Sequence, residues 1–320
     1  MRFAYQGLAI LFIGALLLAS GCGAKSGPSA AMDDAAAVDK TWPPKGQVPE
    51  LALTPADKLV VVRTAEKLAT DNPYAKFWQD APYLDVPVLK QNVASPQLAE
   101  ASVASVRVQA VTDGDNVAWR LSWDDPTPDG VVDSGQFSDG VAIEFPIDLG
   151  AIPMMGHRGA KVQILYWKAQ WQKDLDVGFQ DVQDLHPNYW ADLYWFAEGE
   201  FPYPIPQAFE DPRSLQWFIA HEAGNPMAVF SRTQPVEELV AEGFGTLTHQ
   251  PESASRGKGV WTDGRWAVVI TRPLKTSDPL DHQFAADGPE QVAFAVWQGS
   301  DENVGGRKHW TNWIPFTVQP

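Results

Sequence analysis

The stretch VRVQAVTDGDNVAWRLSW, residues 106–123, contains two runs in which apolar and polar residues alternate, separated by a short turn. Alternation with a period of two places the apolar side chains on one face of a β-strand. Asp113-Gly114 supplies the positive-φ residues that a hairpin turn requires. The stretch therefore predicts a β-hairpin whose shared apolar face carries Val106, Val108 and Ala110 from the first strand and Val117, Trp119, Leu121 and Trp123 from the second.

The same alternation recurs along the chain, in VAIEF (141–145), KVQILYW (161–167), RWAVVIT (265–271), QVAFAVW (291–297) and WIPFTV (313–318). LVVVRTAEKLA (59–69) is compatible with a helix that starts at Thr54-Pro55, but the valines at 60–62 favour a strand. Turns rich in Pro, Gly and Asp separate these runs. We therefore predict an all-β fold, an antiparallel β-sandwich.

Residues 172–258 form a different kind of segment, aromatic and proline-rich, without regular alternation. We predict a long insertion that leaves the sheets and serves a site or an interface. Within it, TQPVEELVAEGFG predicts one short helix. Thr233 is a suitable cap, Pro235 lies in the first turn and Gly243 is a suitable stop.

The N-terminal segment has the features of a bacterial lipoprotein signal. A charged residue, Arg2, precedes an apolar run at 8–18 and small residues before Cys22. We predict that residues 1–22 are a signal ending at lipidated Cys22, that 23–50 are a flexible tether, and that 51–320 form the sandwich domain. The alternative is an ordinary leader that is cleaved near Gly21. The expected location is the periplasmic side of the envelope, with the outer membrane favoured by Gly23.

Composition excludes several classes of protein. A net charge of −16 and a pI of about 4.7 argue against nucleic acid and against charge-driven docking on anionic lipid, so the lipid is the expected membrane attachment. Because Cys22 is the one cysteine, an internal disulfide, a cysteine zinc site and covalent c-type haem attachment are excluded.

Motifs for hydrolytic chemistry are weak. G-x-S-x-G does not occur, and HEAGN (221–225) lacks the second histidine of a zinc helix, so we interpret it as a loop. The carboxylates of WDDPTPDG (123–130) suit either calcium or a solvated turn, and the turn is favoured.

Fourteen tryptophans suggest a second function, stacking platforms of a secreted, lipid-anchored carbohydrate- or solute-binding sandwich. Strand alternation predicts that four of them fill the core instead: Trp119, Trp123, Trp266 and Trp297. The freer candidates for ligand contact lie in the insertion: Trp190, Trp195 and Trp217.

Two adjacent methionines, Met154 and Met155, stand in a Pro/Gly-rich turn before the strand predicted at 161–167. A thioether there either fills a gap in the core or ligates a soft metal such as haem iron. Spacing alone favours the gap-filling interpretation.

A family resemblance adds to this interpretation. It is carried by five segments in order: FSDGVAIEFP, PMMG followed by GAKVQILYWKA, PVEELVAEGFGTLT, GVWTDGRWAVVITRPL, and VAFAVWQGSDENVGGRKHWTNW. From about residue 58 to the C-terminus the chain resembles the ethylbenzene dehydrogenase-related family, the haem b (gamma) subunits of periplasmic molybdoenzymes. These enzymes include ethylbenzene and dimethylsulfide dehydrogenases, selenate and chlorate reductases and nitrite-oxidoreductase-like complexes. The family's fold is a β-sandwich.

The resemblance implies one non-covalent haem b with a methionine and a lysine as axial ligands. The matching positions are Met155, with Met154 as the alternative, and Lys308, beside which His309 is an alternative ligand. Lysine ligates only as the neutral amine, so its pKa must fall below about 10.4.

With both axial positions filled, the resemblance implies electron transfer rather than catalysis by this chain. The implied partners are an iron–sulfur beta subunit, a molybdopterin-containing catalytic alpha subunit and a soluble redox protein such as a cytochrome c. The leading hypothesis is thus an electron-transfer haem b subunit of an oxidoreductase complex.

Overall fold

The computed structural model describes residues 41–44, 48–180, 182–187, 216–285 and 290–319. Fourteen strands dominate these residues: β1 Leu59–Arg63, β2 Leu84–Pro87, β3 Leu89–Lys90, β4 Ser105–Thr112, β5 Asn116–Asp124, β6 Gly140–Pro146, β7 Val162–Lys168, β8 Val236–Ala241, β9 Thr248–His249, β10 Arg256–Thr262, β11 Arg265–Pro273, β12 Glu290–Trp297, β13 His309–Trp310 and β14 Ile314–Val318. The helices among them are short: α1 Ala169–Val177, α2 Val182–Leu185, α5 Ile219–Glu222, and the 3₁₀ helices η1 Lys76–Gln79, η2 Pro226–Ala228 and η3 Gly299–Asp301.

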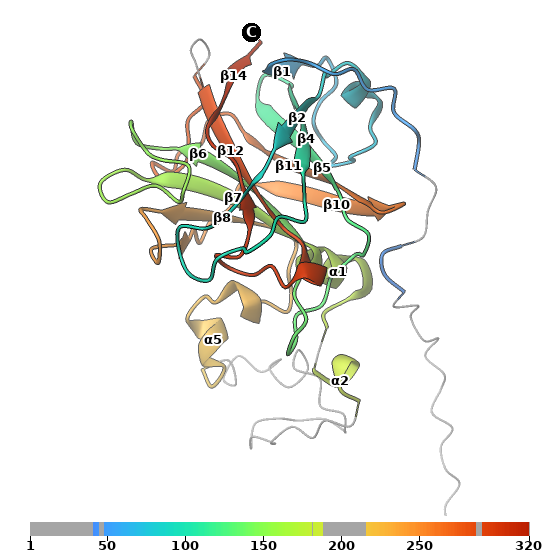
Figure 1. The fold of residues 1–320 in the computed structure, drawn as a ribbon, viewed down its shortest axis with the longest axis vertical. Helices are drawn as coiled ribbons and strands as arrows, with labels where there is room; N and C mark the ends of the chain where they lie inside the picture. Colours follow the sequence, from blue (N-terminus) through green and yellow to red (C-terminus); the bar gives the residue numbers. More distant parts are fainter. Residues whose placement is uncertain (1–40, 45–47, 181, 188–215, 286–289, 320) are drawn as a thin grey trace, which may run out of the picture. The chain divides into compact units, whose positions relative to one another are not determined.

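Eleven of the strands form one hydrogen-bonded path, β10-β11-β5-β4-β1-β14-β12-β6-β7-β8-β9, which folds into two layers at β12. The other three pair beside it, β2 with β4 and β13 with both β12 and β3. The first residues of β12, 290–292, pair with β14, whereas 293–297 pair with β6. In Figure 1, β6, β7 and β8 lie on one side of the molecule and β1, β2, β4 and β5 on the other. The predicted β-sandwich is therefore confirmed.

The opening hairpin forms as predicted, with β4 and β5 paired antiparallel around Asp113-Gly114. One strand departs from the antiparallel prediction. β1 runs parallel to both of its neighbours, β4 and β14. The connection over residues 64–104 is long enough for a parallel return, which a tight turn does not allow. The ambiguous stretch at 59–69 thus contributes a strand, as its valines indicated.

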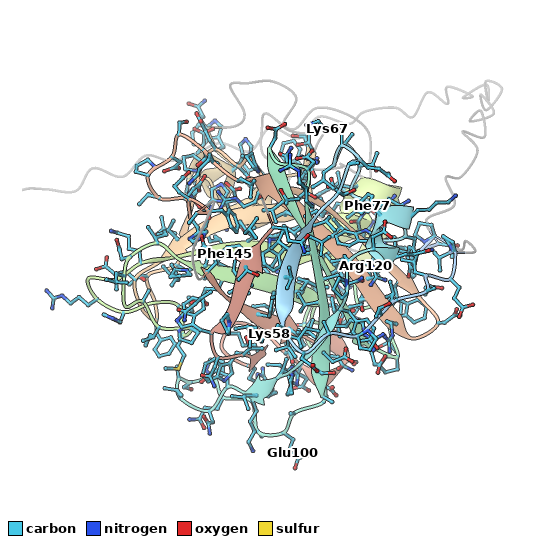
Figure 2. All side chains as sticks on the ribbon, turned by 90° about the horizontal axis from the view of Figure 1, so that it is seen from above. Lys58, Lys67, Phe77, Glu100, Arg120 and Phe145 are labelled. Carbon is cyan, nitrogen blue, oxygen red and sulfur yellow. The ribbon has the colours of Figure 1, made fainter. Side chains whose placement is uncertain are left out.

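Tryptophans from both layers meet in one core. Trp119 of β5 contacts Phe145 of β6 and Phe316 of β14, with ring centroids 5.6 and 5.2 Å apart. Figure 2 shows Phe145 in the middle of the molecule, whereas Lys67 and Glu100 lie at its edge. The core-filling prediction is confirmed for Trp119, Trp123 and Trp266, each of which is at most 1% exposed. Trp297 is also buried, but it belongs to a separate, smaller apolar cluster and lines a cavity.

The helix predicted from Thr233 to Gly243 is wrong, because this segment contains β8, which pairs antiparallel with β7. All six residues of β8 are buried. Two glutamates in this segment, Glu237 and Glu238, instead accept hydrogen bonds from residues elsewhere in the fold. Glu237 bonds His249 at 2.6 Å, and Glu238 accepts hydrogen bonds from the Ser255 hydroxyl and the Ala254 N–H.

The described part of the predicted insertion, 172–258, carries most of α1 and all of α2 and α5, and α1 and α5 lie below the sheets in Figure 1. The prediction that the whole segment leaves the sheets is wrong for its last part, because β8, β9 and the start of β10 lie within it. His221 and Glu222, interpreted above as loop, end α5, and residues 223–225 leave the helix. Trp217 is 52% exposed. Trp190 and Trp195 lie outside the described residues, as do Cys22 and the rest of the predicted signal and most of the tether.

Among the described residues, no helix combines the length and the apolar character needed to cross a membrane.

Candidate functional site

Met155 sits in an unusual backbone conformation. Its φ is +66° and that of Gly156 is +67°, so two consecutive residues adopt the left-handed region. Glycine is required at 156, because a Cβ there would lie 2.5 Å from the carbonyl oxygen of Ala160. A methionine with positive φ is strained, and such strain is maintained where the surrounding structure fixes the residue.

Two contacts hold this turn in place. The Met155 carbonyl accepts a hydrogen bond of 2.7 Å from the Gly243 N–H, and the Gly156 N–H donates one of 3.1 Å to the Ile152 carbonyl. The Met155 side chain is half-buried against a small apolar cluster of β6, β7, β8 and β12 residues. The turn thus directs the thioether towards the outer face of the β6–β7–β8 layer.

Lys308 lies on the same face, although it comes from a segment near the C-terminus. It immediately precedes β13, which pairs with both β12 and β3. The Lys308 carbonyl accepts a hydrogen bond of 3.0 Å from the Gln91 N–H. The Lys308 Nζ lies 5.1 Å from the centroid of the Trp297 ring, close enough for a cation–π contact when the amine is charged.

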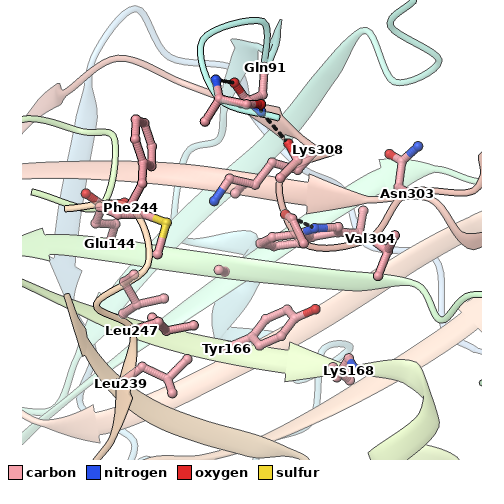
Figure 3. Close-up of a pocket in the computed structure, with 18 of the residues that line it drawn as sticks. Gln91, Glu144, Tyr166, Lys168, Leu239, Phe244, Leu247, Asn303, Val304 and Lys308 are labelled. Carbon is pink, nitrogen blue, oxygen red and sulfur yellow. Dashed lines mark hydrogen bonds between the residues drawn. The ribbon is translucent and has the colours of Figure 1, made fainter. Parts of the chain in front are cut away.

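Met155 and Lys308 line one cavity of about 480 Å³. Most of its walls are apolar, and Figure 3 shows Leu239, Phe244 and Leu247 on one side of it and Lys308 and Gln91 on another. The remaining apolar lining includes Ala142, Ile164, Phe294, Ala295, Trp297 and Val304. The fold therefore brings together two residues that are roughly 150 positions apart in the sequence.

A carboxylate lies near both predicted ligands. Glu144 of β6 lines the cavity, and its carboxylate accepts a hydrogen bond from the Met155 N–H. Burial raises the pKa of Glu144 to about 7, whereas the nearby Lys308 and the Met155 N–H act in the opposite direction. Burial lowers the pKa of Lys308, and the attraction of Glu144 opposes that shift. A lowered lysine pKa is the direction that ligation by a neutral amine requires.

Gln91 ties together the loops around Lys308. Its Nε2 donates to the carbonyls of Ala94 at 2.7 Å and Gly306 at 2.8 Å, and its Oε1 accepts from the Val93 N–H at 2.6 Å. These bonds join the segment after β3 to the segment before β13. Because Gln91 is buried, the Lys308 backbone is held on a rigid support.

The two alternative ligands occupy different positions. Met154 does not line the main cavity but lines a smaller adjoining one, together with Met155 and Lys308. His309 lines neither cavity and is fully buried. Its Nε2 accepts hydrogen bonds from the N–H groups of Ser102 and Val103, at 3.0 and 3.2 Å.

The remaining ring nitrogen of His309, Nδ1, lies 3.2 Å from the Val296 carbonyl, to which it donates. Both ring nitrogens are therefore used in tying β13 to β12 and to residues 102–103, and no lone pair faces the cavity. Burial also lowers the pKa of His309. This geometry gives the histidine a structural role.

Sequence analysis did not identify Glu144, Gln91 or Trp297 as site residues. One signal was present for Glu144, which is the single charged residue in the strand VAIEF. Gln91 has no sequence signal, because its role depends on carbonyls that come from two distant loops.

A mostly apolar cavity with a few converging polar side chains, built on a β-sandwich, is typical of a cofactor- or ligand-binding protein. Residues 75–309 match the model of the family described as ethylbenzene dehydrogenase, and the chain belongs to that family. The resemblance found in the five sequence segments is thereby confirmed.

Relatives of known description agree with this assignment. A protein of Haloferax mediterranei named as a respiratory nitrate reductase heme subunit is 26% identical over 83% of this chain and 75% of its own length. The chlorate reductase subunit gamma of Ideonella dechloratans is 24% identical over 82% and 84%. The dimethylsulfide dehydrogenase subunit gamma of Rhodovulum sulfidophilum is 25% identical over 63% and 56%.

Among solved structures, a family 9 carbohydrate binding module from Caldicellulosiruptor kristjanssonii in complex with cellotriose aligns over 82% of this chain and 94% of its own. The TM-score is 0.35 and the identity 8%, and at this distance its ligand says nothing about the present cavity.

Proposed function

We propose that this chain is a haem b electron-transfer subunit of an oxidoreductase complex whose catalytic site lies on another subunit. The observation that supports this most strongly is the common cavity of Met155 and Lys308, which the family resemblance identifies as the axial pair. The relative from Haloferax mediterranei is named a heme subunit, which supports the same cofactor.

The cavity residues fit the proposed group. A thioether and a buried amine are donors that haem iron accepts, and an axial methionine tends to raise the reduction potential. Apolar walls suit the faces of a porphyrin and keep water away from the iron. Glu144 also fits, because its Oε1 is buried and has no hydrogen-bond partner among the described residues. Glu144 lines the same cavity as Lys308, whose amine extends into it (Figure 3).

When bound, haem b supplies a one-electron iron couple. Met155 and Lys308 would occupy both axial positions, so that no site is left at the iron for a substrate. Gln91 and the paired strands around β13 keep the Lys308 backbone in one place, and the turn at 155–156 does the same for the thioether. Rigid ligands require little rearrangement when the charge of the iron changes, which favours rapid electron transfer.

Partners follow from the same proposal. Two relatives are named gamma subunits, of a chlorate reductase and of a dimethylsulfide dehydrogenase. We expect an iron–sulfur beta subunit and a molybdopterin-containing alpha subunit, with a soluble protein such as a cytochrome c exchanging electrons with the complex.

Lipidation of Cys22 would place the domain on the periplasmic side of the envelope, anchored by acyl chains alone. In fractionation, we expect the wild-type protein with membranes and Cys22→Ser released or unprocessed. Wild-type protein that is wholly soluble would contradict the anchor and leave the haem proposal unaffected.

The cofactor is tested by absorption spectroscopy of the full chain, purified and titrated with haem. We expect saturation at one haem per chain, a sharp Soret band, and low-spin bands on reduction. Acidified organic solvent should extract the haem, because the attachment is non-covalent. A folded protein that stays colourless at excess haem would contradict the proposal, and so would a spectrum that remains high-spin in both oxidation states.

A further inference from the structure

A second cluster of polar groups lies apart from the cavity, where β5 ends and β6 begins. One oxygen from each of Asp125, Asp129 and Asp139 lies within 4.8 Å of the other two. Sequence analysis favoured a solvated turn here, and that interpretation is wrong for Asp125. Asp125 and Asp139 are 0% exposed, and only Asp129 is half-buried.

Asp139 is held rigidly by donors from three segments. Its Oδ1 accepts from the Gly299 N–H at 2.7 Å, and its Oδ2 accepts from the Asp129 N–H at 2.7 Å and the Trp266 indole at 3.0 Å. Three N–H donors stabilise an ionised carboxylate. The cluster is therefore built around a carboxyl group that is held in one position and not around a mobile surface side chain.

Asp125 supplies an oxygen with no partner. Its Oδ1 accepts from the Thr127 N–H at 3.2 Å, but its Oδ2 is buried and has no hydrogen-bond partner among the described residues. One oxygen of this fully buried side chain lies within 4.8 Å of an oxygen of Asp139 and of an oxygen of Asp129. A buried carboxylate oxygen without a hydrogen bond costs free energy unless a cation or a proton satisfies it.

The protein provides no such cation from its described part. Among these residues, no ion pair within 4.0 Å involves any of the three carboxylates, and the nearby Arg265 pairs with the exposed Asp124 instead. Burial raises the pKa of Asp139 to about 9, with repulsion from Asp125 adding to the shift, and burial raises the pKa of Asp125 to about 6. These buried oxygens therefore require either a bound cation or a shared proton.

We propose that Asp125, Asp129 and Asp139 bind a divalent cation, and that the cation is Ca²⁺. Oxygens that share Ca²⁺ at about 2.3–2.6 Å lie at most about 5 Å apart, and the observed limit of 4.8 Å satisfies this. Three carboxylates without a nitrogen or sulfur donor suit a hard cation. Ca²⁺ also tolerates irregular geometry better than Mg²⁺, with water completing its shell.

The ion has a structural consequence. It joins the loop between β5 and β6 to both strands, and this loop contributes Val132, Phe137 and Ser138 to the wall of the cavity. The proposal stands independently of haem, because none of the three carboxylates lines the cavity.

The test uses the full chain, freed of metal with EDTA and dialysed. Calcium chloride is titrated by calorimetry up to about 10 mM, well above the 10⁻⁴–10⁻³ M range of weak calcium modules. Tb³⁺ is added separately, and its emission is recorded while tryptophan is excited. We expect one site, a rise in unfolding temperature with Ca²⁺, and Tb³⁺ emission sensitised by the indole of Trp266 and displaced by Ca²⁺.

The variants are Asp125→Asn and Asp129→Asn, and the matched control is Asp124→Asn, whose carboxylate is exposed and outside the cluster. Each cluster variant should weaken Ca²⁺ binding by at least about tenfold, as loss of a ligand does, whereas the control should bind like the wild type. Asp129 is half-buried, so its variant decides the question if Asp125→Asn fails to fold.

Two results would overturn the proposal. The first is a folded wild type that shows no heat, no thermal shift and no Tb³⁺ emission, which would mean that a shared proton satisfies the Asp125–Asp139 pair. The second is binding that both cluster variants retain or that Asp124→Asn also loses, which would place the ion elsewhere.

Discussion

Met155→Leu is the substitution that tests the axial assignment with the least disturbance of the fold. Leucine has a similar volume and is also unbranched at Cβ, so the strain of the positive φ at this position stays nearly the same. Volume-conserving swaps in packed interiors cost less than about 1.5 kcal/mol. Met155 is only half-buried, so its cost should fall within that bound, against a stability of about 5–15 kcal/mol for a typical domain.

The haem, by contrast, should change strongly in Met155→Leu, because one of its two axial bonds is lost. We expect high-spin character, weaker retention of haem and a lower reduction potential, since axial methionine raises the potential. The assays are absorption spectra in both oxidation states, a redox titration, and urea unfolding to show that the fold persists.

Met154→Leu is the matched control, with the same chemical change one position away. It should leave the spectrum nearly unchanged, because Met154 does not line the main cavity. Lys308→Arg should lose low-spin character like Lys308→Ala, since guanidinium keeps its proton.

His309→Ala separates structural from ligand roles. It should cost stability, because the Ser102 and Val103 N–H groups lose their acceptor at about 1–3 kcal/mol each, yet leave the folded fraction low-spin. The reasoning is refuted if Met154→Leu disturbs the spectrum and Met155→Leu does not, or if His309→Ala alone abolishes the low-spin bands.

Three further predictions concern the fold. Gly156→Ala should lower the free energy of unfolding by more than about 1 kcal/mol, because φ is +67° and the new Cβ meets a carbonyl at 2.5 Å; equal urea midpoints would contradict this. Asp281→Ala should cost about 3–5 kcal/mol by leaving Arg272 buried and unpaired, whereas breaking the surface pair with Arg265→Ala should cost at most about 1 kcal/mol in the same assay. Burial raises the pKa of Glu238, so the folded state holds its proton more tightly; its stabilisation is full below about pH 4.3 and is lost as pH rises through the raised value. Urea unfolding of Glu238→Gln across pH should show a flatter profile than the wild type, and parallel profiles would count against this account.

The sequence by itself located half of the fourteen strands among the described residues. Period-two alternation depends only on neighbouring residues, and it correctly located β4, β5, β6, β7, β11, β12 and β14 within a residue or two. It also predicted that Trp119, Trp123 and Trp266 fill the core, because side chains on one face of a strand share one environment. The motif order was sufficient to place the chain in its family.

Pairing partners and buried polar contacts were decided only by tertiary structure. The segment 233–243 carries acceptable helix signals, yet its glutamates find His249 and Ser255 across the sheet, and those contacts outweigh a weak local preference. The parallel direction of β1 depends in the same way on where a long connection returns.

The site, like the fold, depends partly on what the sequence determined and partly on what only the tertiary structure decided. Sequence resemblance named Met155 and Lys308, but only the folded chain places both on one cavity, adds Glu144 beside them and turns His309 away. It also buries Asp125, which the sequence presents as part of a polar turn. The reason is physical: burial and hydrogen bonding of a polar group depend on residues far away in the chain, and local patterns carry no record of them.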